Sequence, residues 1–204
     1  MDYVKTLDDG LVRCAWGTGL PDYVAYHDQE WGRPTTDRSL LFEKLCLEGF
    51  QSGLSWLTIL RKRDAFRAGF SDFVPETVAV FDDSDVARLL GDAGIVRHQG
   101  KIRSAINNAQ QVLAWEQKEG DFARWIWRNW ADPSNEPPIE IAATTERSAA
   151  LARVLKKASF TFVGPTTVYA FMQAMGLVND HYAECHVRGD CQKERIALID
   201  TLRH

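Results

Sequence analysis

Apolar residues recur at helical spacing along most of this 204-residue chain, and the strict alternation typical of half-buried strands is almost absent. One stripe joins Leu41 to Leu45, and a longer one runs through Ile102 and Ile106 until Gly120 interrupts it. This periodicity predicts a chain built almost entirely of α-helices.

Cap and turn residues give the expected helix limits. Asp37 precedes one helix and Gly49 ends it, Pro75 and the acidic cluster 82–84 each open a short helix, and Thr145 caps another. Further helices are expected from Trp56 onward and over residues 102–120 and 166–175, and the segment 122–130 holds three of the seven tryptophans.

The composition is that of a folded protein, because 45% of the residues are hydrophobic and 11% are aromatic, enough for a sizeable core. Turn residues and prolines at 132–138 break the helical pattern, but over a length typical of a loop. We expect one compact domain of two fused helical lobes over residues 1–188. For the tail, 189–204, the sequence leaves open a docked helix or a frayed end.

Charge and cysteine content narrow the classes of protein. The net charge of −4 argues against a protein that coats nucleic acid nonspecifically, because that mode of binding needs a basic field. The four cysteines, without a secretory leader pattern, indicate thiols or metal ligands rather than disulfides. No apolar run approaches the ~18 residues of a membrane span. We expect a cytoplasmic protein that does not contact a membrane.

Cysteine and histidine occur as two pairs at opposite ends of the chain: Cys14 with His27, and His181 with Cys185. On a helix His181 and Cys185 would lie on one face, and two such pairs would complete a tetrahedral Cys2His2 zinc site with no open position, hence a structural one. Spacing alone favours the plainer alternative of a buried thiol and surface histidines. His186 and Cys191 are rival ligands near the same pair.

A short glycine turn, residues 160–167, separates two expected helices. It has the shape of a helix-hairpin-helix element, in which backbone amides around Val163, Gly164 and Thr166 would hold a DNA phosphate without many basic side chains. A glycine in this position is also an ordinary helix end.

Glu48 falls on the apolar stripe of its helix, where an ionised carboxylate is costly to bury without a partner. It is either a functional group or a residue left in water by fraying at Gly49. The aromatic residues that could stack on a ligand near it, although aromatic residues are more often core, are Trp16, Tyr26, Trp31 and Trp56.

Six stretches, in order from Cys14 to Cys185, together resemble the bacterial 3-methyladenine DNA glycosylase I family. They are RCAW (13–16), AYHDQEWG (25–32), CLEGFQSGLSW (46–56), DAGIVRH (92–98), FVGPT (162–166) and FMQAMGLVNDH (171–181). The resemblance implies an all-α, helix-hairpin-helix glycosylase fold, with one structural zinc joining the N- and C-terminal segments.

The resemblance also implies the activity. The enzyme would be a monofunctional glycosylase that excises 3-methyladenine from alkylated double-stranded DNA by hydrolysis of the N-glycosidic bond, with free 3-methyladenine as product. We expect a monomer. Many relatives with a helix-hairpin-helix element carry a catalytic aspartate about twenty residues after the hairpin glycine, whereas the nearby acids here, Asp180 and Glu184, lie in the metal-ligand segment.

Carried onto this chain, the resemblance assigns residues to roles. Glu48 and Tyr26 would be the catalytic pair and also bind the base, together with Trp16 and Trp56. Further assignments are a wedge into the DNA stack at Gly53 and Leu54, and zinc ligands at Cys14, His27, His181 and Cys185. The chain departs from the pattern at Phe50, Ser52, Leu57 and Pro165, which affects the shape of the pocket mouth.

Two other functions compete with this one. A damage-binding protein without activity would keep the fold, but the joint presence of Glu48, Tyr26 and Trp56 disfavours it. A zinc hydrolase would need an open coordination position, which a Cys2His2 set closes.

Overall fold

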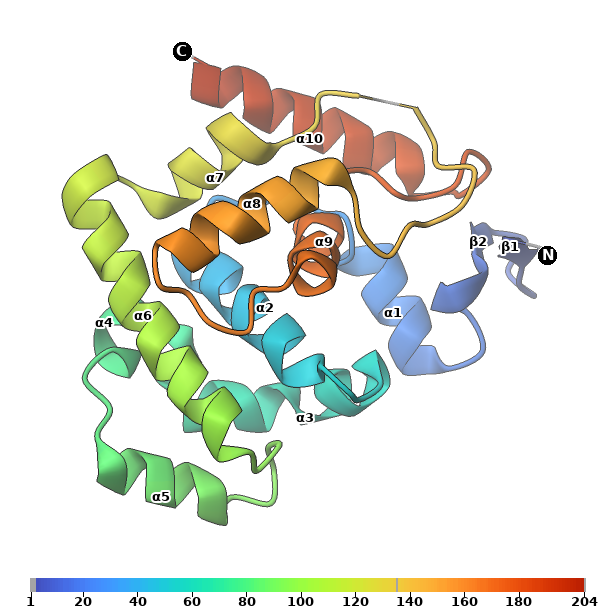
Figure 1. The fold of residues 1–204 in the computed structure, drawn as a ribbon. Helices are drawn as coiled ribbons and strands as arrows, with labels where there is room; N and C mark the ends of the chain where they lie inside the picture. Colours follow the sequence, from blue (N-terminus) through green and yellow to red (C-terminus); the bar gives the residue numbers. More distant parts are fainter. Residues whose placement is uncertain (1–2, 135, 204) are drawn as a thin grey trace.

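The computed structural model describes residues 3–134 and 136–203, and it is mostly helical (Figure 1). The helices are α1 (Pro21–Gln29), α2 (Arg38–Gln51), α3 (Trp56–Gly69), α4 (Pro75–Val78), α5 (Asp83–Gly91), α6 (Gln99–Glu119), α7 (Phe122–Trp130), α8 (Glu146–Lys157), α9 (Pro165–Ala174) and α10 (Arg188–Arg203). Two 3-10 turns, Ala15–Gly17 and Ser71–Phe73, complete the helical elements.

Helix α2 lies at the centre and packs against α3, α6, α7 and α9 (Figure 1). Its start is set locally, because the Asp37 carboxylate accepts hydrogen bonds from the amides of Ser39 and Leu40. Every residue from 41 to 50 is buried, including Glu48. A helix surrounded on all sides can carry a polar residue into the interior of the protein.

Phenylalanine rings from α2, α3 and the segment after α3 form the nearby core. Phe50 stacks obliquely on Phe66 at 4.6 Å between ring centroids, and Phe70 lies parallel to Phe73 at 5.2 Å. All four are fully buried, and each contributes about 2–3 kcal/mol through burial. This core fixes the position of α2 relative to α3, on either side of the turn that joins them.

The C-terminal tail is a docked helix, which settles the alternative that the sequence left open. Helix α10 packs against α7, and Arg128 of α7 donates to the Leu202 carbonyl oxygen at 2.8 Å. The fully buried Arg195 donates to the carbonyl oxygen of Leu177. Because much of the buried face of α10 is polar, the helix lacks the apolar stripe that identifies an amphipathic helix.

A small antiparallel sheet, which the periodicity did not predict, precedes the first helix. Its strands β1 (Val4–Thr6) and β2 (Val12–Cys14) pair with Val4 opposite Cys14, and Gly10 turns the chain between them with φ +77°. Strands of three residues are too short to produce a recognisable alternation. The pairing fixes the position of Cys14 at the end of β2.

Residues 158–164 form the tight connection between α8 and α9, which pack against each other. The Asn108 side chain of α6 holds this turn through both of its polar atoms, which bond the Thr161 amide and carbonyl at 2.8 and 3.0 Å. Val163 is buried, and Gly164 is the N-cap residue of α9 without a side-chain cap. The first amides of α9 therefore have no side-chain acceptor from their N-cap residue.

Within the described residues, no helix is both long and apolar enough to cross a membrane.

Candidate active site and metal cluster

The four predicted base-binding residues line one cavity of about 280 Å³, enough for a planar base. Trp16 comes from the turn after β2, Tyr26 from α1, Glu48 from α2 and Trp56 from the start of α3. Gln173 of α9 also lines this cavity, which we call the base cavity. The fold thus brings together residues from five separate segments.

Glu48 is only 6% exposed, and α2 continues past it to Gln51, so the helix does not fray at Gly49. Its Oε1 lies 3.0 Å from the Nζ atom of Lys44, one turn earlier on the same helix. The buried carboxylate therefore has the partner that its burial requires.

Aromatic rings form the walls of the base cavity. Tyr26 and Trp56 lie 5.3 Å apart between centroids, while the Trp16 ring meets Tyr26 edge-on at 6.4 Å. The indole Nε1 atoms of Trp16 and Trp56 are buried without a hydrogen-bond partner among the described residues. Both N–H groups are covered by surrounding protein atoms.

Lys44, like Gln173, was not among the site residues predicted from the sequence. Lys44 is 5% exposed, and its ammonium donates to the Tyr26 hydroxyl at 2.6 Å and lies 3.3 Å from the Trp56 ring centroid. Burial lowers its pKa to about 8, despite the opposing attraction of Glu48. Burial, with the Glu48 charge, raises the pKa of Tyr26, so its hydroxyl stays protonated. The sequence signal was the i, i+4 spacing of Lys44 and Glu48.

The predicted wedge lies on the turn between α2 and α3, and residues on both sides of this turn line the base cavity. Gly53 has φ +81°, a conformation that favours glycine, and Leu54 is 41% exposed. Lys101 of α6 supports the turn by donating to the carbonyl oxygens of Phe50 and Ser52 at 2.8 and 2.6 Å. Leu54 is therefore an exposed side chain on a supported turn beside the base cavity.

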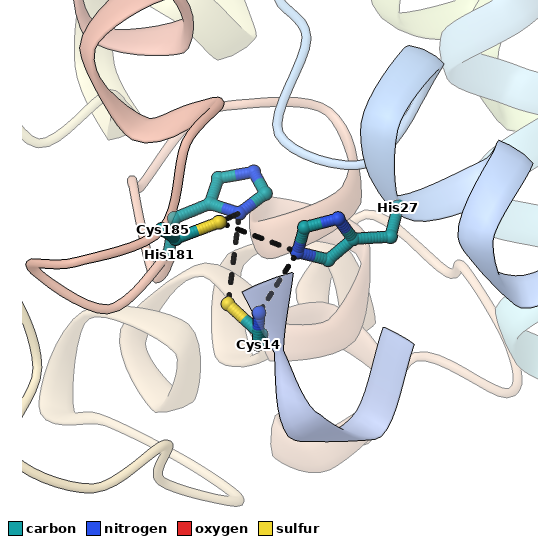
Figure 2. A group of neighbouring side chains, drawn as sticks. All are labelled: Cys14, His27, His181 and Cys185. Carbon is teal, nitrogen blue, oxygen red and sulfur yellow. Dashed lines mark hydrogen bonds between the residues drawn. The ribbon is translucent and has the colours of Figure 1, made fainter. Parts of the chain in front are cut away.

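Cys14, His27, His181 and Cys185 form a second, fully buried cluster (Figure 2). Their side chains point toward one another from the end of β2, from α1 and from the segment between α9 and α10. The Sγ atom of Cys185 lies 3.5 Å from His27 Nε2 and 3.4 Å from His181 Nδ1, and Cys14 Sγ lies 3.7 Å from the same His181 atom.

These distances suit a tetrahedral zinc site, in which bonds of about 2.3 Å to sulfur and about 2.0 Å to nitrogen leave S···N edges of about 3.5 Å. The outward nitrogen of each histidine is engaged: His27 Nδ1 bonds Asp28 at 2.8 Å and His181 Nε2 bonds the Trp31 carbonyl at 3.1 Å. Each ring therefore turns its other nitrogen toward the sulfurs. The hydrogen bond between the two thiols lowers the pKa of Cys185 and raises that of Cys14, so Cys185 is the sulfur of the pair that ionises first.

The segment that carries His181 and Cys185 is a series of turns, so the helical geometry expected for this pair was wrong. The Arg188 side chain explains the difference, because it donates to the carbonyl oxygens of Asn179 and His181, at 2.9 and 2.6 Å, in place of helical amides. The turns still bring both ligand atoms together.

The two rival ligands have other surroundings. His186 directs Nε2 to the Asp28 carboxylate at 3.1 Å. Cys191 is fully buried in α10, and burial raises the pKa of its thiol to about 11. Neither belongs to the group of four whose ligand atoms all lie within 4.8 Å of one another.

Comparison with known proteins matches residues 16–188 to the methyladenine glycosylase family model. DNA-3-methyladenine glycosylase 1 of Escherichia coli is 48% identical over 86% of this chain and 96% of its own length. The chain belongs to the methyladenine glycosylase family. The DNA-3-methyladenine glycosylase of Haemophilus influenzae is 42% identical, over 85% of this chain and 96% of its own. The resemblance inferred from the six motifs is confirmed.

Solved structures of methyladenine glycosylases share the fold. A crystal structure of 3-methyladenine DNA glycosylase I with 48% identity superposes with a TM-score of 0.80, covering 85% of this chain and 98% of the other. A structure of 3-methyladenine DNA glycosylase I from Staphylococcus aureus, which describes the structural basis of 3-methyladenine recognition by that enzyme, is 36% identical in sequence. It superposes with a TM-score of 0.80 and covers 86% of this chain and 96% of the other. The match with this chain therefore covers nearly the whole length of both proteins.

Proposed function

We propose that this chain is a DNA glycosylase that excises 3-methyladenine from alkylated DNA by hydrolysing the N-glycosidic bond. The observation that carries the proposal is the convergence of Glu48, Tyr26, Trp16 and Trp56 on one base-sized cavity. Two relatives named DNA-3-methyladenine glycosylase match this chain along nearly their full length, so we infer the complete activity of such an enzyme for this chain.

The target base has to leave the duplex before it can enter the cavity. A methylated base pairs poorly, so extruding it costs less than extruding a normal base. Leu54, exposed on the turn beside the cavity, fills the gap left in the stack. The amides at the start of α9, after Gly164, hold a phosphate of the same DNA as part of a helix-hairpin-helix element.

Methylation at N3 makes the adenine cationic, so the glycosidic bond is already weakened and the base departs neutral. Little acid catalysis is needed. The Glu48 carboxylate hydrogen-bonds the base and favours its positive charge, while Trp16 and Trp56 stack on it and Tyr26 contacts an edge. Water then attacks the sugar carbon, where positive charge develops.

Cys14, His27, His181 and Cys185 hold one structural zinc ion. A closed shell of four protein ligands stabilises the fold and leaves no position for substrate. His27 follows Tyr26 directly in α1, so the ion secures the helix that carries a wall of the base cavity. Monomeric state and cytoplasmic location stay predictions from the sequence.

The test is release of 3-methyladenine from methylated duplex DNA, identified chromatographically, by wild type, Glu48→Gln and Glu43→Gln. We expect wild type to release the base and Glu48→Gln to lose about 100-fold in rate, as when one charge-stabilising group is removed elsewhere. Glu43 is a matched control, because it is buried on the same helix but pairs with Arg67. No release by wild type contradicts the proposed enzyme; full activity of Glu48→Gln contradicts the role of Glu48.

A further inference from the structure

A second cavity, of about 200 Å³, lies behind the base cavity, and Tyr26 and Trp56 line both. Glu48 lines the base cavity, whereas Lys44 lines the cavity behind it. Two rings and one ion pair therefore make up the partition between the two spaces. Lys44 stands on the rear side of that partition.

The Lys44 ammonium contacts three of the four base-binding residues at once. It donates to the Tyr26 hydroxyl at 2.6 Å, pairs with the Glu48 carboxylate at 3.0 Å and lies over the Trp56 ring at 3.3 Å from the centroid. An ammonium has three donors and a compact charge, so it can serve one hydroxyl, one carboxylate and one ring face together.

The other charged groups around the rear cavity form ion pairs that do not include Lys44. Glu30 pairs with Arg63, Glu43 pairs with Arg67 at 2.9 Å, and Arg33 pairs with Glu194 at 2.5 Å. These groups reach the cavity from α2, α3 and the segment after α1. Glu48 is left as the acidic partner of Lys44, which ties the ammonium to the base cavity rather than to its rear neighbours.

We propose that Lys44 is a positioning residue of the base cavity, which holds the Glu48 carboxylate, the Tyr26 hydroxyl and the Trp56 ring in position toward the base. The inference rests on the proposed glycosylase function. Lys44 does not touch the base, so it acts on base release and leaves the affinity for DNA unchanged. Without the ammonium, the buried carboxylate loses its compensating charge and the contact that orients it.

Three substitutions separate the properties of the side chain. Lys44→Met keeps its length without donors or charge, Lys44→Gln keeps a donor without the charge, and Lys44→Arg keeps both, with room in the rear cavity for the longer group. We expect the single-turnover rate of Lys44→Met to fall about 10- to 100-fold, as for lost support of a catalytic group, and that of Lys44→Arg to recover most of it. Lys118→Met, on the exposed end of α6, controls for loss of one cation.

The pH profile gives a readout that a purely structural role would not move. Burial lowers the pKa of Lys44 to about 8, so the ammonium is present below that pH and is lost as the pH rises through it. We expect the rate ratio of wild type to Lys44→Met to decline across this range. A ratio that stays constant between pH 6 and pH 10 contradicts the proposal.

A double-mutant cycle with Glu48→Gln tests whether Lys44 acts through Glu48. We expect Lys44→Met to cost less in the Glu48→Gln background than in wild type, because the carboxylate to be positioned is gone and only the effects through Tyr26 and Trp56 remain. The double variant buries no unpaired charge, so it keeps the test usable if Lys44→Met does not fold. Independent, multiplicative losses overturn the inference, and so does a fully active Lys44→Met. Failure of wild type to release any base counts instead against the proposed function.

Discussion

Asp28 shows how much one residue can connect in this protein. Its carboxylate accepts hydrogen bonds from Arg13 at 2.8 Å and contacts His27 and His186 at 2.8 and 3.1 Å. Burial alone would raise the pKa of this carboxyl, but these hydrogen bonds outweigh the effect and lower the pKa to about 2. Asp28 therefore joins the small sheet to the metal cluster.

At this scale we predict that Asp28→Asn lowers the free energy of unfolding by about 2 kcal/mol at pH 7, the equivalent of the lowered pKa. Because the pKa is lowered by folding, this stability is present above about pH 4 and is lost as the pH falls toward 2. Urea denaturation at several pH values measures it. Asp64→Asn, whose side chain is fully exposed, should match wild type throughout. A difference from wild type that persists unchanged at pH 2 would contradict the account.

At the scale of elements, α9 serves two surfaces. Its C-terminal half contributes Gln173 to the base cavity, and its N-terminus follows the Gly164 turn that we assign to DNA. At Gly164 an effect on DNA binding can be tested without an effect on folding. Its φ of −68° is one that any residue adopts, and a Cβ there would meet nothing within 4 Å. A side chain can be added without disturbing the turn.

We predict that Gly164→Asp keeps or raises the thermal midpoint, because aspartate is a good N-cap, yet weakens DNA binding about 10-fold by placing a negative charge where a phosphate belongs. Gly164→Asn is the matched control, with the same size and cap but no charge. Fluorescence anisotropy on duplex DNA gives the affinity, and differential scanning fluorimetry the midpoint. Equal affinities for the two variants would show that no phosphate is bound there.

At the scale of the whole molecule, the Cys/His cluster joins segments more than 150 positions apart, since His27 and Cys185 are separated by 158 residues. A link of that length restricts the unfolded chain more than a local contact does. It also holds the small sheet and α1 against the turns before α10.

We predict that Cys185→Ser loses bound zinc and about 3 kcal/mol of stability, which is about 6–12 °C in midpoint for a chain of this size. The base preference of the folded fraction should stay the same, because the cluster does not line the base cavity. Mass spectrometry of the metal content and calorimetry provide the measurements. Cys191 was a rival ligand in the sequence, and the Cys191→Ser variant is expected to keep the zinc bound by the other four residues. A Cys185→Ser protein of normal stability but altered base preference would reverse this division of roles.

Local sequence was sufficient for most of the helices and for the family. The start of α2 follows from the Asp37 cap, and the stop of α6 from Gly120, because caps act within a few residues. The motif around Glu48 was likewise readable, since its residues are neighbours in the chain.

Tertiary structure alone decided which distant residues meet. Lys44 belongs to the site because α1 places the Tyr26 hydroxyl 2.6 Å from its ammonium. Helix α10 is docked because Arg195 donates a hydrogen bond to a backbone carbonyl oxygen of another segment, that of Leu177. Helix propensity and periodicity report forces that act within one turn or one face. Contacts between polar atoms far apart in the chain depend on packing of the whole molecule, and no spacing in the sequence records them.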